Sequence, residues 1–203
     1  MADRSGVVES MSPQEQAIAD AAIRVIVNGG LDAASVRKVA RQAGVAPGTV
    51  QYFMGTKEVL LQKALLRSAA RQHERVGAID HAPTSGPLER LGAALAELLP
   101  IGEIQREDAA LWVILGGAAS TRPGLAAQYQ RELGLFQDRL LAALTPGDGA
   151  AGNGGDAAAQ TARLITALVN GLTLDYLNTP ATGGTRAAIM GDLTTGLRKL
   201  LAG

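Results

Sequence analysis

The chain has 203 residues, no cysteine and a formal net charge of zero. Without cysteine, a disulfide framework, a thiol nucleophile and a cysteine-based metal site are excluded. Alanine, leucine and glycine dominate and β-branched runs are scarce, so we expect an all-α protein of one large or two small domains. No apolar run approaches the roughly 18 to 20 residues that would cross a bilayer, and the N-terminal stretch lacks the apolar core of a signal peptide. We therefore expect a cytoplasmic location and no membrane partner.

The charges are unevenly distributed along the chain. Residues 37–73 hold seven basic residues and one acidic residue, whereas residues 1–36 hold two and five, and residues 74–203 hold ten and thirteen. A positive segment within a neutral chain is typical of a phosphate-binding face. The charge alone indicates an ordinary solvated helix face equally well.

Two longer helices are expected in the first part of the chain. Ser12 caps the first, Glu15 completes a capping box, and the glycines at 29 and 30 are expected to end it. Thr56 caps the second, which is expected to reach about Ile79.

Two short helical patterns lie between them. Ser35 caps one, Pro47 begins the other, and Gly44 supplies the tight turn that joins them. The residues expected to be buried on these two helices are Val36, Val39, Ala40, Val50 and Phe53.

Five further helical patterns follow, and they bring the expected total to about nine helices with no strand. They cover residues 88–99, 104–120, 123–144, about 156–177 and about 185–201, with a glycine-rich low-complexity loop at 146–155. The last two patterns are amphipathic. Part of their apolar surface suits a four-helix interface between two copies of the chain.

The two short helices and their turn have the layout of a helix-turn-helix, whose second helix enters the major groove of DNA while the first crosses the backbone. Thr49 is placed for a phosphate contact, Gln51 can pair bidentately with adenine, and Arg37 can reach guanine. Lys57, at the start of the next helix, can hold the DNA backbone as a point charge. The sequence therefore predicts double-stranded DNA as a partner.

Three segments in this region carry a family resemblance: V-A-R-Q-A-G-V, A-P-G-T-V-Q-Y-F-M and G-T-K-E-V-L-L. With them in register, residues 12 to about 65 resemble the TetR family of bacterial transcriptional repressors. The resemblance implies a helix-turn-helix DNA-binding domain over residues 12–57. It also implies a C-terminal helical domain over residues 58–203 that binds a small ligand and dimerises.

The resemblance also assigns DNA-binding roles to individual residues. It places base contacts on Arg37, Pro47, Gly48 and Gln51, and backbone contacts on Ser35, Thr49, Tyr52 and Lys57. This chain departs from the family pattern at Ala46, which replaces a Ser or Thr cap, at Gln51, which replaces Tyr, and at Phe53-Met54. Two other interpretations stay open, because Tyr52 can cover the core between the short helices and Arg37 can be a solvated surface charge.

The C-terminal half is similar to the BetI-like branch of the same family, through residues 106–125 and 170–175. Members of that branch respond to choline-type or other small metabolites, so the resemblance implies a small-molecule effector. The candidate ligand-binding residues are Trp112, Tyr129, Phe136, Asn170 and Asp175. The aromatic residues are also typical of a core. The two polar residues, expected inside an apolar helix, can pair within the fold or with a second subunit. An aromatic cage for a cation would be thin.

The leading hypothesis is a ligand-responsive transcriptional repressor that a small-molecule effector releases from a palindromic operator. An enzyme is not expected, because His73-Glu74 lacks the second histidine of a zinc-protease motif and no glycine run has phosphate-loop spacing. No cofactor or metal is expected for the same reason. A third hypothesis is an all-helical interaction protein whose helix-turn-helix no longer binds DNA.

Overall fold

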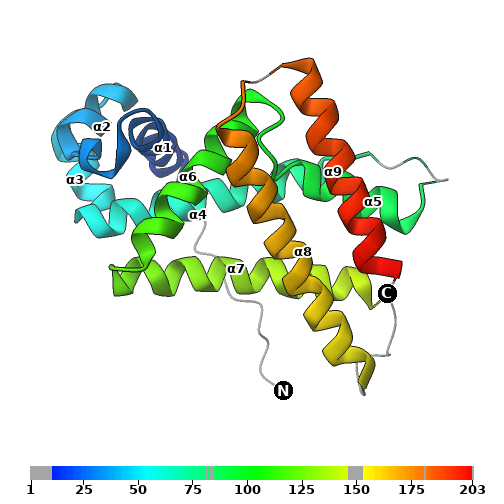
Figure 1. Ribbon diagram of the computed structural model, residues 1–203. Coiled ribbons are helices and arrows are strands. Elements are labelled where there is room, and N and C mark those ends of the chain that lie inside the picture. The colour runs from blue at the N-terminus through cyan, green and yellow to red at the C-terminus, as the bar shows by residue number, and fades with distance from the viewer. Residues whose placement is uncertain (1–10, 81, 83–84, 146–152, 181, 203) are drawn as a thin grey trace.

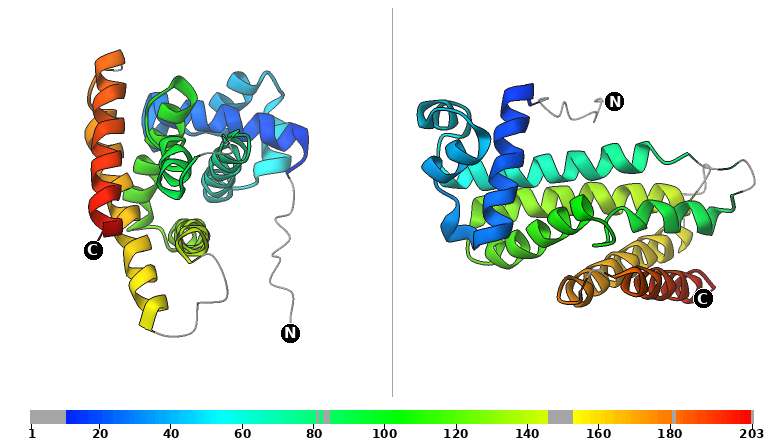
Figure 2. Two further views of the ribbon diagram at one scale, coloured as in Figure 1. Left: turned by 90° about the vertical axis from the view of Figure 1, so that its right-hand side faces the viewer. Right: turned by 90° about the horizontal axis from the view of Figure 1, so that it is seen from above.

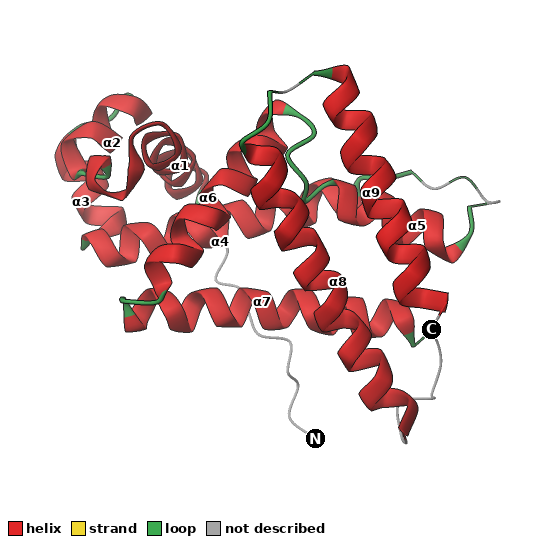
Figure 3. Ribbon diagram, in the orientation of Figure 1, coloured by secondary structure: helices red, strands yellow, loops and turns green. Residues whose placement is uncertain are grey.

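The computed structural model describes residues 11–80, 82, 85–145, 153–180 and 182–202, and every regular element in these ranges is an α-helix (Figures 1 and 3). The nine helices are α1 (Pro13–Ala33), α2 (Val36–Ala43), α3 (Pro47–Met54), α4 (Lys57–Gly77), α5 (Pro87–Ala96), α6 (Glu103–Ala119), α7 (Pro123–Leu144), α8 (Asn153–Leu177) and α9 (Gly183–Ala202). The predicted all-helical fold is confirmed. None of the described helices is both long and apolar enough to cross a membrane.

The N-terminus of α1 forms the capping box that its sequence predicts. The Glu15 backbone N–H donates to Ser12 Oγ at 3.3 Å, and the Ser12 backbone N–H donates to Glu15 Oε2 at 2.9 Å. The predicted break at the glycine pair is present. Gly30 adopts a non-helical conformation with a φ of 72° and kinks the chain, and a further short helical stretch then continues to Ala33.

The two short helices are shaped by local signals at their ends. Ser35 Oγ accepts the Lys38 backbone N–H at 3.3 Å at the start of α2. Gly44 ends α2 in the left-handed conformation, and the Val45 N–H then donates back to the Ala40 carbonyl at 3.0 Å. A residue with a side chain would be strained at Gly44, so the sharp turn into α3 depends on this glycine.

The inner surfaces of the short helices pack into a core with α1 and α4. Val39, Ala40 and Val50 are buried as predicted. Met54 rather than Phe53 completes this surface: Met54 is fully buried, and Phe53 is only partly buried at its edge. Two successive helical residues lie about 100° apart, so only one of them can point into the core.

Helix α4 joins the two halves of the molecule. Helices α1, α2 and α3 gather at one of its ends, and the remaining helices lie along and beyond it (Figure 1). The core of the N-terminal helices continues into Leu111 and Leu115 of α6 and Leu125 of α7. The two halves therefore share apolar packing instead of being joined only by a linker.

A second core lies at the other end of the molecule. It is built from α5, the end of α7, α8 and α9, with Leu99, Ile165 and Leu193 fully buried. Helices α8 and α9 lie side by side on one face of the molecule (Figure 2). The Arg106 guanidinium donates to the carbonyls of Tyr176, Leu177 and Thr179 and so caps the C-terminal end of α8.

Candidate DNA-binding surface and effector cavity

The outer surface of α2 and α3 brings together the residues predicted to contact DNA. Seven of them are exposed: Ser35, Arg37, Pro47, Gly48, Gln51, Tyr52 and Lys57. Thr49 is partly exposed. Polar and small side chains therefore share one accessible surface, which is formed by α2, the turn and the start of α3. We call this set of eight residues the reading surface.

Tyr52 does not cover the core. Its side chain is 82% exposed, and its ring meets the Phe53 ring edge-on, with centroids 5.0 Å apart and an interplanar angle of 84°. The interpretation of Tyr52 as a core residue is therefore wrong. The Phe53 ring holds the aromatic face of Tyr52 outward, where the phenol is free to meet a partner.

Two members of the reading surface already have partners within the chain. Gln51 Nε2 donates to the Gly55 carbonyl at 2.8 Å, one turn further along. Lys57 Nζ lies 4.0 Å from an Asp32 carboxylate oxygen, and both groups are largely exposed. Exposed contacts of this kind contribute little stability, so a competing ligand can replace them at low cost. Gln51 must rotate away from Gly55 before it can pair with a base.

The basic segment noted in the sequence divides into two parts in the structure. Between Ser35 and Lys57 there are four basic residues and no acidic residue. Further along α4, Lys63, Arg67 and Arg71 are instead held in ion pairs within the fold. Positive charge is therefore concentrated in residues 35–57, the segment that contains the reading surface, whereas Lys63, Arg67 and Arg71 have a structural role.

The N-terminus of α3 has no side-chain cap. Ala46 occupies the cap position and makes no side-chain hydrogen bond, while Pro47 follows at the first helical position. Backbone N–H groups at an uncapped N-terminus attract anions such as phosphate, and the helix dipole favours the same contact. The absence of the usual cap thus leaves this helix end open to the DNA backbone.

Lys63 fixes α3 relative to its neighbours. Its ammonium group donates to Glu15 Oε1 at 2.8 Å and to the Phe53 carbonyl at 2.7 Å. One side chain of α4 therefore joins the start of α1 to the C-terminal end of α3. This cluster holds the pKa of Glu15 at about 2, because the Lys63 hydrogen bond and the capping bonds of Ser12 stabilise the carboxylate.

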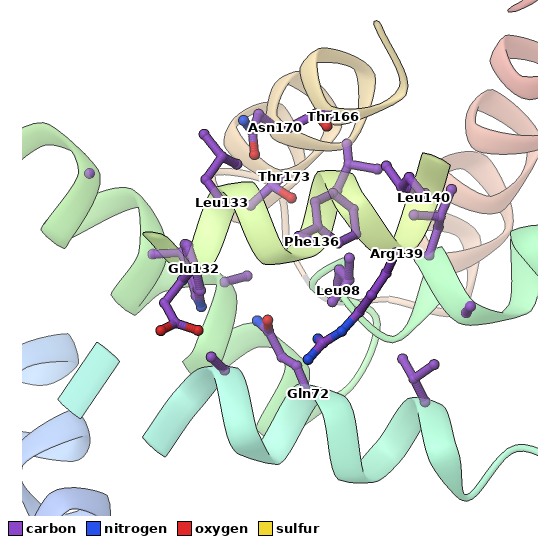
Figure 4. Close-up of a pocket in the computed structure, with 18 of the residues that line it drawn as sticks. Gln72, Leu98, Glu132, Leu133, Phe136, Arg139, Leu140, Thr166, Asn170 and Thr173 are labelled. Atoms are coloured by element: carbon purple, nitrogen blue, oxygen red, sulfur yellow. The ribbon is translucent and has the colours of Figure 1, made fainter. Parts of the chain in front are cut away.

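A cavity of about 500 Å³ lies between α4, α5, α6, α7 and α8, and its size suits a small-molecule ligand. Most of its wall is apolar. Four of the five predicted ligand-binding residues line it, namely Trp112, Tyr129, Phe136 and Asn170. Figure 4 shows Phe136 and Asn170 together with polar groups that the sequence analysis missed, among them Gln72, Glu132 and Arg139.

Asp175 is exposed and is not among the residues that line the cavity, so the prediction that it shares this site is corrected. Asp175 is five positions after Asn170 in the sequence, which is a rotation of about 140° around α8. Thr166, Asn170 and Thr173 share the cavity face, and Asp175 points elsewhere.

Two of the aromatic residues of the cavity, Trp112 and Tyr129, form a pair. The rings of Trp112 and Tyr129 lie 5.4 Å apart, tilted by 58°. Trp112 Nε1 is buried and has no hydrogen-bond partner, and burial raises the pKa of Tyr129. A ligand acceptor beside the indole would satisfy the Trp112 donor.

The missed polar residues have a recognisable spacing. Tyr129, Glu132, Phe136 and Arg139 recur every three or four residues along α7, which places them on one face of that helix. Gln72 comes from α4, and its approach to this face depends on tertiary packing. The helical spacing could have identified the face of α7, but not its partner across the cavity.

A buried ion-pair cluster lies between the cavity and the N-terminal helices. Asp108 of α6 is fully buried and accepts from Ser68 at 2.7 Å, Arg71 at 2.6 Å and Arg75 at 2.8 Å, all on α4. Arg71 also contacts Asp20 of α1 at 3.4 Å. Arg71 therefore touches both the helix that supports the reading surface and the helix that carries Trp112 in the cavity wall.

Comparison with known proteins places both parts of the chain in one family. Residues 18–64 match the family described as bacterial regulatory proteins of the tetR family, and residues 87–202 match the C-terminal domain of the BetI-type transcriptional repressors. The chain belongs to the TetR family. Families of this kind are transcriptional regulators, so the predicted ligand-responsive, DNA-binding regulator is confirmed, and the chain is not an enzyme.

Individual relatives support the same family. The HTH-type transcriptional regulator BetI of Rhizobium meliloti is 31% identical over 146 residues, which are 68% of each chain. The repressor KstR of Rhodococcus jostii is 32% identical over 62% of this chain and 56% of its own length. A Rhodococcus transcriptional regulator of known structure aligns with a TM-score of 0.79 and 28% identity, over 94% of this chain and 97% of the other.

A second solved structure shares the TetR fold at lower identity. It is a regulator from Saccharomonospora viridis in complex with choline, with a TM-score of 0.72 and 20% identity over 93% of this chain and 97% of its own. In the part of this chain that the structure describes, no group of three or more candidate ligands is placed to hold a metal ion.

Proposed function

We propose that this TetR-family regulator binds a palindromic DNA operator as a homodimer through the reading surface and is released by a small molecule in the cavity. In this proposal α3 enters the major groove, with Gln51, Gly48 and Pro47 next to base edges, and Arg37 reaches a guanine from α2. Ser35, Thr49, Tyr52 and Lys57 hold the phosphate backbone. The observation that carries the proposal is the exposed reading surface, which lies within residues 35–57, a segment with four basic residues and no acidic residue.

The dimer is proposed to form through α8 and α9. Residues exposed on α8 recur every three or four positions and include Leu164, Ala167, Gly171 and Leu174. On α9 the exposed positions include Ala188, Gly191 and Thr195. Small residues let two helices approach closely, and the exposed leucines supply apolar area. A two-fold dimer would present two reading surfaces to two half-sites.

Release is proposed to act through α4. Gln72 and Val76 of α4 line the cavity, while Ser68, Arg71 and Arg75 of the same helix hold Asp108. A ligand that favours one position of α4 would change the contacts of Arg71 with Asp20 and so move the support of the reading surface. The effect on DNA affinity equals the difference in ligand affinity between the two positions.

The proposal is tested by measuring binding to DNA from upstream of the protein's own gene. Arg37→Ala is expected to weaken binding by about 1–3 kcal/mol and to relax specificity at one base position, whereas Lys57→Ala weakens all sequences alike. Arg90→Ala is the matched control, because Arg90 is an exposed arginine on α5, far along the chain from the reading surface. Equal affinity for Arg37→Ala and Arg90→Ala would refute the base-reading role.

A further inference from the structure

The effector cavity has two chemically different parts. Its deep wall is apolar and buried, with Leu95, Leu140 and Val169. Its more exposed part carries nitrogen donors from two helices, Gln72 on α4 and Arg139 on α7. Figure 4 shows the Arg139 side chain extending from α7 across the cavity toward Gln72, with Phe136 beside it. An apolar space that ends in such donors suits an amphipathic molecule.

Arg139 is the charged group in the cavity wall that the fold leaves unmatched. None of the ion pairs among the described residues includes its guanidinium. A guanidinium stays charged at any physiological pH, and its donors form a planar fork that matches a carboxylate. Placed beside an apolar wall, it is a group that an anionic ligand would complement.

Glu132, the acidic residue of the cavity wall, already has a hydrogen-bond partner within the chain. Glu132 Oε1 already accepts a hydrogen bond from Gln128 Nε2 at 2.8 Å. Burial raises the pKa of Glu132, while Arg139 and Arg131 oppose this at longer range. One oxygen of Glu132 therefore already has a partner on its own helix, whereas the Arg139 guanidinium has no ion-pair partner among the described residues.

We propose, building on the proposed role of this cavity as the effector site, that its ligand is a monocarboxylic acid with a largely apolar body. The carboxylate binds the Arg139 guanidinium and the Gln72 amide at the exposed end. The apolar body lies against Phe136 and the buried leucines. A ligand acceptor beside Trp112 completes the fit at the aromatic end, where the indole N–H has no partner.

The test uses the full-length protein and three probes of equal chain length: decanoate, 1-decanol and decyltrimethylammonium, all below their micellar concentrations. Trp112 is the only tryptophan of the chain and lines the cavity, so its fluorescence reports binding, and calorimetry gives the affinities. Decanoate is expected to bind tightest. Arg139→Gln should weaken decanoate at least 10-fold and leave 1-decanol within about 2-fold, because only the charged head loses its partner. Arg139→Lys should give an intermediate loss, and Glu132→Gln should not weaken decanoate.

Either of two results with these variants would overturn the inference. One is unchanged decanoate affinity in Arg139→Gln, with thermal unfolding showing a folded variant. The other is tighter binding of decyltrimethylammonium that Glu132→Gln abolishes, which would make the site a cation site. Measuring operator binding by the wild type and the variants, with and without decanoate, distinguishes a failure of this inference from a failure of the proposed function. If wild type binds its operator but not decanoate, the carboxylate inference fails alone. If decanoate binds through Arg139 without releasing DNA, the effector role fails and the ligand class stands.

Discussion

At the scale of single residues, the Glu15 carboxylate is held by Lys63, the side chain that joins α1, α3 and α4, and it makes stability depend on pH. Glu15 has a pKa of about 2 in the folded protein, against about 4.5 for an unperturbed glutamate. A lowered folded pKa stabilises the protein above the unfolded value, and this contribution is lost as the pH falls from about 5 through about 2. The Glu15 side chain is 22% exposed, so solvent screens part of this stabilisation.

Glu15→Gln is therefore expected to lower the free energy of unfolding at pH 7 by about 1–2 kcal/mol, through loss of the Lys63 pair and part of the capping box. Urea unfolding of wild type and variant at pH 7, 5, 4 and 3 measures the difference. The gap should be constant from pH 7 to about 5 and shrink toward pH 3. A gap that stays constant to pH 3 would show that the carboxylate charge is not what stabilises the helix.

Capping and turn residues are the single residues whose roles the sequence predicts well. Ser12, Ser35, Gly44 and Thr56 act on backbone groups within a few residues, so their roles could be predicted from the sequence and are confirmed. Whether Phe53 or Met54 points inward depends on the rotation of α3 against α1 and α4, which local spacing does not determine. The exposure of Tyr52 depends on the same rotation.

At the scale of elements, α4 links α1 to α6 through Arg71. Its guanidinium contacts Asp20 at 3.4 Å and Asp108 at 2.6 Å, so the two carboxylates share one partner although they lie on different helices. Residues that share a partner show non-additive effects of about 0.5–3 kcal/mol when both are changed. The link is the structural basis for the proposed release of DNA.

A double-mutant cycle with Asp20→Asn and Asp108→Asn tests this link. We expect an interaction energy of at least about 0.5 kcal/mol in chemical unfolding. Asp20→Asn with Glu97→Gln is the matched control, since Glu97 pairs with Arg75 and shares no contact with Asp20. The control pair should be additive within about 0.5 kcal/mol. If the effects of Asp20→Asn and Asp108→Asn on unfolding free energy are additive, Arg71 does not couple α1 to α6.

The ion-pair cluster was beyond what the sequence could predict. Glu107 and Asp108 are adjacent acids near the start of α6, yet only Asp108 is fully buried. Its burial depends on three side chains of α4 from about 30 to 40 positions earlier in the chain. The wall of the cavity also depends on tertiary packing, because Gln72 and Arg139 come close only when α4 and α7 pack together.

At the scale of the whole molecule, the proposed dimer predicts the effect of a charge on α8. Leu164 is 46% exposed and lies on the exposed stripe with Ala167 and Gly171. Leu164→Glu should place two like charges close to the two-fold axis and shift the protein toward monomer, with loss of operator binding. Sedimentation over a range of concentrations measures the shift. Leu135→Glu on α7 is the control, because Leu135 is exposed to a similar extent, at 41%, but lies outside α8 and α9.

We propose that this TetR-family protein reads DNA as a dimer through α2 and α3. Selection of bound fragments from a random DNA pool, with a count of the protein chains on each fragment, tests this proposal. A dimer should enrich a palindrome whose half-site centres are about 34–36 Å apart, with an even number of chains on each fragment. Selection that enriches no common sequence, or a single chain bound to an isolated half-site, would contradict the claim.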